Sequence, residues 1–347
     1  GRGWLAMVAE LLAAEEEQPS GWGGRGACGK FTALVLGQVL SVLLTGTGIF
    51  NTFLADASVD IPAAQSSLNY FLLSLHLALV ASRLCREGPA VAWWRYALWA
   101  ACDVEANFLT VWSYQYTSIA SVMLLDCFAI PSSMVLSRVL MGAAYTRGHV
   151  IASLACVVGL TLTVASDTMV GKVGPSPKGP TWFGDLLVLC GATLYGFSNV
   201  LQEWLLKGTR RRLEALGMLG LFGSVLSCLQ TALTEREALA RCVWSSSTVL
   251  CLLGYQLCLF SFYVLSSAFL MAADAALFNV SLLTSDFYSV IFSWVVQHGQ
   301  LTWVYCIAFA MTIGGLLFYH IQPPATAPAR EDPGRGAGGL LAGTLGT

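Results

Sequence analysis

Charged residues are scarce in this sequence. Asp, Glu, Lys and Arg make up 11% of the 347 residues, whereas a typical soluble domain contains about 25%. The net charge is −2, and no basic patch interleaved with aromatic residues is present. We therefore expect no nucleic-acid partner.

Motifs for catalysis and metal binding are also missing. The chain has no HExxH, GxSxG or Walker motif, which argues against a zinc or serine hydrolase and against an ATP-driven pump. The 11 cysteines are scattered singly without a CxxC pair, as small buried hydrophobic residues are. His76, His149, His298 and His320 are dispersed along the chain. We predict that the protein is not an enzyme and has no cofactor, no metal site and no disulfide framework.

Long apolar segments are what the sequence has in abundance. Hydrophobic residues make up 56% of the chain, and the mean hydropathy is +0.67. A helix needs about 20 apolar residues to cross a bilayer. The predicted spans are 31–53, 63–81, 94–114, 119–139, 150–168, 182–201, 213–233, 249–270, 273–296 and 303–319. We therefore predict an all-α polytopic membrane protein of about ten transmembrane helices, with the lipid bilayer as its surroundings.

The distribution of basic residues supports this number of spans. If the N-terminus is cytosolic and the loops alternate between sides, 14 of the 18 Lys and Arg residues lie on the cytosolic side. The four on the far side are Lys172, Lys178, Arg236 and Arg241. The positive-inside rule predicts this bias, and one missed or additional helix would reverse every downstream loop. Both termini are therefore predicted to be cytosolic.

A weak internal repeat divides the spans into two sets of five. At an offset of 155 residues, the aligned pairs are Ala120 with Ala275, Val135 with Val290, and Gly159 with Gly314. Because five is odd, the second half enters the membrane from the opposite face. Inverted repeats of this kind are common in transporters, with the binding site near the midplane between the halves.

The repeat gives a predicted division of the whole chain. Residues 31–168 and 182–320 form the two five-helix repeats, and 169–181 connect them. Residues 1–30 form a cytosolic N-terminal tail, and the residues after 320 form a cytosolic low-complexity tail at 321–347. Both tails are expected to be disordered because they lack a pattern that could form a packed core.

Ionisable side chains within a span are costly in lipid and indicate function by default. Asp103 and Asn107 are four residues apart and share one helix face. Glu105 points about 200° away from Asp103, so the two cannot face one cavity. Asp126 lies five residues before Pro131, a residue that can leave a backbone carbonyl free to face a cavity.

A second group lies in the span 273–296, where Asn279 and Asp286 follow one stripe. Polar residues in a bundle can also cap a helix or bond a neighbouring backbone. For Asp103 and Asp126 the two interpretations are equally open, and for Asp286 we favour function. Asp185, Glu203 and Asp274 lie near span ends and are interpreted as structural. The candidate solute-binding residues are Asp286, Asn279, Asp126, Asp103, Asn107, Tyr70, Tyr195 and Asn199.

The same stretches carry a family likeness. They are DVEAN at 103–107, YQYTS at 114–118, LLDCFAIP at 124–131, GDLLVLCGATLYGFSNVLQE at 184–203, LGMLGLFG at 216–223 and FNVSLLTSDFYS at 278–289. With them the chain resembles the F branch of solute carrier family 35, in the drug/metabolite transporter superfamily. The resemblance implies ten helices in two inverted five-helix repeats and secondary transport by alternating access. Relatives in this family exchange nucleotide sugars for nucleoside monophosphates in the Golgi, whereas the F branch suggests nucleobase- or nucleoside-like solutes.

One departure bears on the substrate. Phosphate groups in a cavity of low dielectric require Lys or Arg within the spans, but Arg95 and Arg138 lie near cytosolic ends and the deeper groups are acidic. We therefore expect a small neutral or cationic heterocycle as solute. The alternatives are a Golgi nucleotide-sugar antiporter and a non-transporting receptor or scaffold. The plasma membrane and the Golgi or another endomembrane are both open as locations, and so is a homodimer.

Overall fold

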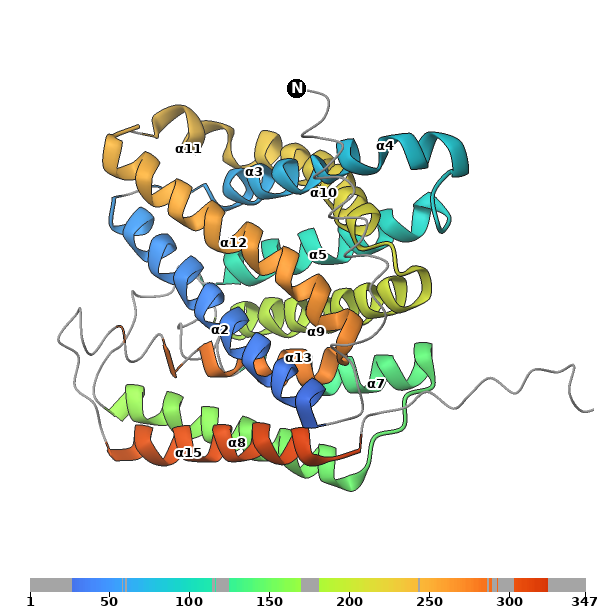
Figure 1. Ribbon diagram of the computed structural model, residues 1–347. Coiled ribbons are helices and arrows are strands. Elements are labelled where there is room, and N and C mark those ends of the chain that lie inside the picture. Colours follow the sequence, from blue (N-terminus) through green and yellow to red (C-terminus); the bar gives the residue numbers. More distant parts are fainter. Residues whose placement is uncertain are drawn as a thin grey trace, which may run out of the picture.

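The computed structural model describes residues 27–57, 59, 61–113, 116, 125–169, 181–242, 244–285, 287, 288, 292 and 303–323. Across these residues the regular structure is helical and includes no β-strand. The elements, shown in Figure 1, are α2 (Ala27–Asp56), α3 (Pro62–Ser74), α4 (His76–Glu87), α5 (Trp93–Ser113), α7 (Ala129–Met141), α8 (Arg147–Met169), α9 (Thr181–Thr209), α10 (Arg212–Gln230), the π-helical turn η1 (Thr231–Glu235), α11 (Arg236–Arg241), α12 (Ser246–Ala272), α13 (Ala275–Leu282) and α15 (Trp303–Ile321).

Each predicted span overlaps a helix, but two spans differ in shape from the prediction. The span 63–81 is not one straight helix, because α3 and α4 meet at a bend of 48°. The span 119–139 is described only from residue 125, and α7 begins at Ala129 after a turn at Cys127 and Phe128. Pro131 therefore lies in the first turn of α7, where a missing N–H is tolerated.

Fewer helices than predicted are both long enough and apolar enough to cross a membrane. In the described part of the chain, four helical segments are long and apolar enough, and the bent pair α3–α4 would be a fifth. The four are Phe31–Phe50, Trp182–Thr209, Arg212–Arg241 and Ser246–Ala272. Shorter apolar helices occur at Ala129–Met141, Arg147–Gly159 and Ala310–Ile321. The protein is thus an integral membrane protein in composition and helix length, while ten crossings remain a prediction.

The outer surface is apolar, as lipid requires. On α12, Leu250, Leu253 and Leu257 form one stripe and are 69%, 59% and 70% exposed. The buried side of the same helix carries Gln256 and Tyr263. Exposed leucines with buried polar groups invert the usual pattern of a soluble helix, and this inversion fits a helix that faces hydrocarbon.

Local signals in the sequence fix several helix ends. Ser245 caps α12 by accepting a hydrogen bond from the Thr248 amide at 3.2 Å. Asp274 caps α13 in the same way, with 2.7 Å to the Leu277 amide. Gly142 ends α7 in a left-handed conformation with φ of 69°, which glycine adopts without a side-chain penalty. These caps define where the chain turns between helices.

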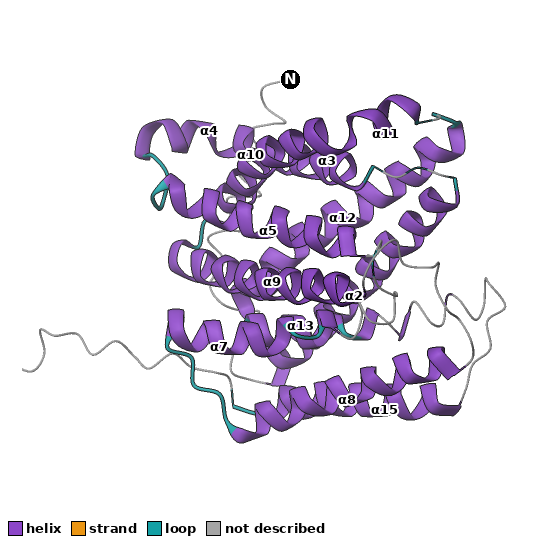
Figure 2. Cartoon of the chain, turned by 180° about the vertical axis from the view of Figure 1, so that it is seen from behind, coloured by secondary structure: helices purple, strands orange, loops and turns teal. Residues whose placement is uncertain are grey.

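The helices pack in layers. In Figure 2 the stack runs from α3, α4 and α10 at one side through α5, α9 and α7 to α8 and α15 at the other. In Figure 1, α2 and α12 lie in front of this stack. The closest pairs are α3 with α10, α5 with α9, α2 with α12 and α8 with α15. The centre of the molecule is therefore bordered by α3, α5, α9 and α12.

A row of glycines brings α10 close to α3. A Cβ atom on Gly220 would lie 2.6 Å from the Tyr70 carbonyl oxygen, and one on Gly223 would lie 2.6 Å from the Tyr70 ring. These glycines, with Gly217 against Leu77, confirm the close helix packing that their spacing of three residues predicts. The contact fixes the position of Tyr70 beneath α10, with its hydroxyl directed to the centre of the bundle.

Candidate functional site: a carboxylate shared by four helices

The carboxylate of Asp103 lies at the centre of a buried hydrogen-bond network. Asp103 is on α5, and only 7% of its surface is exposed. Its Oδ2 accepts hydrogen bonds from the Tyr70 hydroxyl on α3 and the Tyr263 hydroxyl on α12, each at 2.6 Å. Its Oδ1 accepts from the Ser198 hydroxyl on α9 at 3.0 Å. One side chain thus connects four helices that are distant in sequence.

Asn107 extends the network by one turn of α5. Its Nδ2 donates to the Tyr70 hydroxyl at 3.3 Å and to the Asp103 carbonyl at 2.8 Å. Its Oδ1 accepts from the Tyr195 hydroxyl on α9 at 2.9 Å. One turn in the other direction, Trp99 Nε1 donates to the Ser198 hydroxyl at 3.1 Å. Residues 99, 103 and 107 are each four apart, so one face of α5 carries the whole set.

The donors around Asp103 are all uncharged. Two phenols and one serine hydroxyl satisfy both carboxylate oxygens, and no Lys or Arg is among these partners. Hydrogen bonds stabilise a buried carboxylate, but its negative charge is not neutralised by them. A cation, or a group that donates hydrogen bonds, would therefore be attracted to this position.

A second polar contact joins α9, the helix that carries Ser198, to α13. The Asn199 Nδ2 on α9 donates to the Asn279 Oδ1 on α13 at 2.9 Å. Asn279 in turn donates to the Ala275 carbonyl at 2.8 Å. Asn199 adjoins Ser198 in sequence and lies one turn from Tyr195. The α9 helix therefore links the Asp103 network to α13.

Six of the eight candidate residues belong either to the Asp103 network or to the Asn199–Asn279 contact. Tyr70, Asp103, Asn107 and Tyr195 share one network, and the Asn199–Asn279 bond lies beside it. The remaining candidates differ from them. Asp126 is half-buried before α7, and its Oδ1 has no hydrogen-bond partner among the described residues. Asp286 lies outside the described residues.

The structure corrects the expected role of Pro131. The carbonyl that Pro131 was expected to leave free belongs to Cys127, four residues earlier. That oxygen accepts a hydrogen bond from the Ile130 amide at 3.0 Å. The carbonyl therefore has a hydrogen-bond partner in the turn before α7 and is not left free.

Three further acidic residues behave as expected. Glu105 is exposed and accepts from Gln230 Nε2 at 2.9 Å, away from the Asp103 network. Glu203 accepts from the Ala275 amide at 2.8 Å and from Lys207 at 2.7 Å, so it stabilises the start of α13. Asp274 is the N-cap of that helix. The structural interpretation of Glu203 and Asp274 is confirmed by these contacts.

Sequence reasoning missed three members of the network: Tyr263, Ser198 and Trp99. Ser198 lies three residues after Tyr195 and directly before Asn199, so helical spacing from Tyr195 could have identified it. Trp99 lies four residues before Asp103 on the same face. Tyr263 carries no such signal, because it stands in a largely apolar helix and contacts Asp103 only through the packing of α12.

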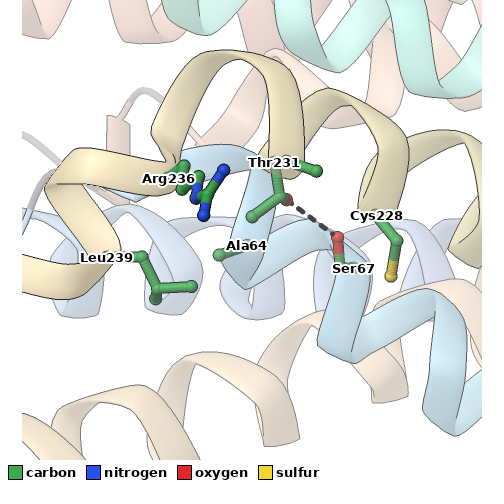
Figure 3. Close-up of a pocket in the computed structure, with 7 residues that line it drawn as sticks. Ala64, Ser67, Cys228, Thr231, Arg236 and Leu239 are labelled. Carbon is green, nitrogen blue, oxygen red and sulfur yellow. Dashed lines mark hydrogen bonds between the residues drawn. The ribbon is translucent and has the colours of Figure 1, made fainter.

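Two surface hollows lie apart from this network. The one drawn in Figure 3 has a volume of about 430 Å³ and is lined by Ala64, Ser67, Cys228, Thr231, Ala232, Arg236 and Leu239. Its Ser67 and Thr231 hydroxyls are 3.3 Å apart. The other, of about 400 Å³, is lined by Ala90, Val91, Arg95, Trp204, Leu205, Gly208, Thr209 and Arg211. Neither hollow includes a residue of the Asp103 network, so both lie outside the candidate site.

Comparison with known proteins decides the family. A profile described as solute carrier family 35, of the SLC35F type, matches residues 29–321, which include every helix described above except the first two residues of α2. The chain belongs to solute carrier family 35. This result confirms the resemblance inferred from the motifs, and it indicates a solute transporter rather than an enzyme.

Individual relatives support the same assignment. Solute carrier family 35 member F2 of Mus musculus is 36% identical over 304 residues, which cover 86% of this chain and 80% of the mouse protein. Its counterpart in Xenopus tropicalis is 34% identical over 83% of this chain and 75% of the frog protein. An uncharacterized solute carrier family 35 member of Schizosaccharomyces pombe is 35% identical, covering 84% of this chain and 58% of the yeast protein.

A solved structure supports the fold. The chain of one crystal structure superposes with a TM-score of 0.66, covering 83% of this chain and 96% of its own length. The sequence identity is 17%, so the likeness concerns the arrangement of helices alone. It carries no information about the solute.

Proposed function

We propose that this family 35 protein is a secondary transporter that moves a small neutral or cationic organic solute by alternating access. The observation that carries the proposal is the buried Asp103 carboxylate, which is held by uncharged donors from α3, α9 and α12. An unneutralised charge at such a position is costly, and in a membrane protein it favours a role in binding. Asp103 would attract the solute, and Tyr70, Tyr263 and Asn107 would orient it.

The pattern of helix contacts supports two inverted repeats. In the proposed repeats, the helices of the first half correspond in order to those of the second: α2 to α9, α3–α4 to α10, α5 to α12, α7 to α13 and α8 to α15. A twofold axis that exchanges the halves should turn each contact between two helices into a contact between the two corresponding helices. The pairs α3–α10, α7–α13 and α8–α15 map onto themselves. The pair α5–α9 maps onto α12–α2, and α7–α9 maps onto α13–α2. These pairs follow the expected exchange, whereas α9 packs more closely on α12 than α2 packs on α5.

Two glycine contacts repeat this relation in detail. On α9, a Cβ on Gly196 would lie 2.8 Å from the Ser132 Cβ on α7. On α2, a Cβ on Gly37 would lie 2.9 Å from the Ser281 Oγ on α13. The first helix of each proposed half therefore approaches a serine on the fourth helix of the other half. This supports a common plan for the two halves.

The Asp103 network crosses the proposed boundary between the halves. Tyr70 and Asp103 belong to the first half, and Ser198 and Tyr263 belong to the second. Alternating access requires the helices that border the site to change their relative position around it. A solute that takes over the hydrogen bonds of Tyr70 and Tyr263 would lower the cost of separating them, which couples binding to the movement.

Uptake into proteoliposomes tests the proposal. The purified protein should accumulate or exchange a neutral nucleobase or a cationic heterocycle, and it should exchange a nucleotide sugar poorly. Poor transport of nucleotide sugars is expected because the network offers a carboxylate where phosphates would need Lys or Arg. Robust nucleotide-sugar exchange would favour the antiporter alternative. Binding of solutes without any flux across the membrane would favour the receptor alternative.

A further inference from the structure

Two buried amide side chains near the Asp103 network carry polar atoms without a hydrogen-bond partner. Asn69 on α3 is 1% exposed, and within the described residues neither its Nδ2 nor its Oδ1 is bonded. Gln256 on α12 is 4% exposed, and its Oε1 is likewise unbonded there. Burying such atoms unpaired is unfavourable, so a retained set of them calls for an explanation.

A hydrogen bond brings the Gln256 amide to the turn of α3 that ends at Asn69. Gln256 Nε2 donates to the Gln65 carbonyl at 3.0 Å. In an α-helix that same carbonyl accepts the amide hydrogen of the residue four positions later, which is Asn69. The Gln256 side chain therefore reaches the turn of α3 that carries Asn69. The two side chains belong to different proposed halves of the transporter.

The amide pair lies next to the carboxylate network along the same two helices. Asn69 directly precedes Tyr70, and Gln256 lies seven residues, or about two turns, before Tyr263 on the same face of α12. The interface between α3 and α12 thus has two polar levels. One is centred on Asp103. The other begins at Asn69, next to Tyr70, and reaches Gln256, which lies about 10 Å from Tyr263 along α12 at 1.5 Å per residue.

We propose that Asn69 and Gln256 form a neutral subsite that binds a cyclic amide or cyclic urea edge of the solute. The proposal rests on the proposed function and specifies its substrate class. Asn69 offers one amide donor group and one acceptor, and Gln256 offers a second acceptor. An edge with N–H groups beside a C=O satisfies these atoms, as planar amide edges do when an asparagine bonds them in a bidentate manner.

Access to the subsite follows from the helix pairing. The α3 helix packs on α10, and α12 packs on α2. Separating these two pairs opens the α3–α12 interface and exposes both amides together with the Asp103 network. The solute would be bound at two points, with the amide edge at Asn69 and Gln256 and its remaining polar or cationic part at Asp103.

Ligand-induced thermal stabilisation of the purified full-length chain tests the subsite. Uracil and hypoxanthine serve as cyclic amides, and 1,3-dimethyluracil serves as the matched compound whose N–H groups are methylated. We expect uracil or hypoxanthine to stabilise the protein and 1,3-dimethyluracil to have at least tenfold lower affinity. Equal affinities for uracil and its dimethyl derivative, or no stabilisation by either cyclic amide, would overturn the proposal.

Variants separate binding from folding. Asn69→Leu, which keeps the size of the side chain, should lower uracil affinity at least tenfold without lowering the melting temperature of the unliganded protein. Thr312→Val is the matched control, because its hydroxyl is also buried and unbonded in the described structure but lies on α15, away from the network. Thr312→Val should bind as wild type does. An Asn69→Leu protein that binds normally would show that the amide serves only packing or water.

A second substitution keeps the test decisive if Asn69→Leu folds poorly. Asn69→Asp preserves the shape and exchanges the donor group for an acceptor, so it should reduce affinity for uracil as well.

Asp103→Asn distinguishes this inference from the proposed function. If Asp103→Asn loses uptake and both Asn69 variants retain uracil binding, the subsite is wrong and the transporter proposal stands. If none of the three changes affects binding or uptake, the proposed site itself is wrong.

Discussion

The phenol rings of Tyr70 and Tyr263 meet edge to face, with ring centroids 6.0 Å apart, and their hydroxyls are 3.3 Å apart. Both hydroxyls donate to the same oxygen of Asp103 at 2.6 Å. This length is typical of an O–H donor bonded to an ionised oxygen. The two tyrosines therefore compete for one acceptor atom, and each compensates in part for loss of the other.

Tyrosine-to-phenylalanine substitutions test this competition. Tyr263→Phe alone should lower the free energy of unfolding by roughly 1–3 kcal/mol, because a hydrogen bond to a charged group is lost. Tyr70→Phe should have a similar effect. The double variant should lose more than the sum of the two, since only Ser198 would then hold the carboxylate. Thermal denaturation of the three proteins in detergent measures the coupling, and additive losses would contradict a shared acceptor.

Asp103 is the residue on which uptake should depend most. Asp103→Asn keeps the shape but removes the charge, so uptake of a cationic solute per folded molecule should fall at least tenfold, or about 1.4 kcal/mol. Glu105→Gln is the control, because Glu105 is on the same helix but exposed. Its uptake should stay within twofold of wild type. Equal effects of the two substitutions, measured in proteoliposomes, would exclude a specific role for Asp103.

Alanine substitution should affect stability differently at two glycines, one packed tightly against Tyr70 and one with open space around it. Gly223→Ala places a Cβ 2.6 Å from the Tyr70 ring and should destabilise the protein, roughly by 1–3 kcal/mol as other overpacked sites do. At Gly314 on α15 a Cβ meets no atom within 4 Å. Gly314→Ala should be neutral or stabilise by up to about 1 kcal/mol, because alanine favours a helix. Melting temperatures of the two variants decide the matter.

Both termini should be accessible from the cytosol. The expectation rests on the asymmetric distribution of the 18 Lys and Arg residues over the loops. Epitope tags at the two ends should be labelled on the same side in selectively permeabilised cells. Labelling on opposite sides would contradict an even number of spans and with it the inverted five-helix repeats.

Asp286 lies outside the described residues and stays a prediction from sequence. It was placed in the span 273–296, where lipid would penalise a carboxylate by at least about 2.5 kcal/mol. Asp286→Asn should therefore reduce surface-normalised uptake more than it reduces the amount of folded protein. Uptake assays beside thermal denaturation separate the two effects. Normal uptake per molecule with poor expression would assign Asp286 a structural role.

Helical periodicity predicted part of the candidate site from the sequence. Spacings of four residues placed Asp103 and Asn107 on one face, and the opposite direction of Glu105 followed from the same geometry. Glu203 and Asp274 were recognisable as structural because they lie near span ends. The underlying reason is that a helix fixes the relative directions of its own side chains, so contacts within one face are local information.

Contacts between helices could not be obtained in this way. Nothing in the sequence near Tyr263 indicates that its hydroxyl meets Asp103, 160 positions earlier in the chain. The bend between α3 and α4 was also missed, since the apolar pattern continues through it without a proline or glycine. Cys127 shows a third limit, because a turn before α7 satisfies the carbonyl that Pro131 was expected to free.

The glycine row of α10 has a mechanical consequence. A helix that rests on the backbone of its neighbour cannot slide past it without a clash, so α3 and α10 are expected to move together although they lie in different sequence repeats. The α12 and α2 helices form another such pair across the repeats. The rigid bodies of the transport cycle would then each combine helices from both proposed repeats, and the hinge lines would cut across the boundary between them.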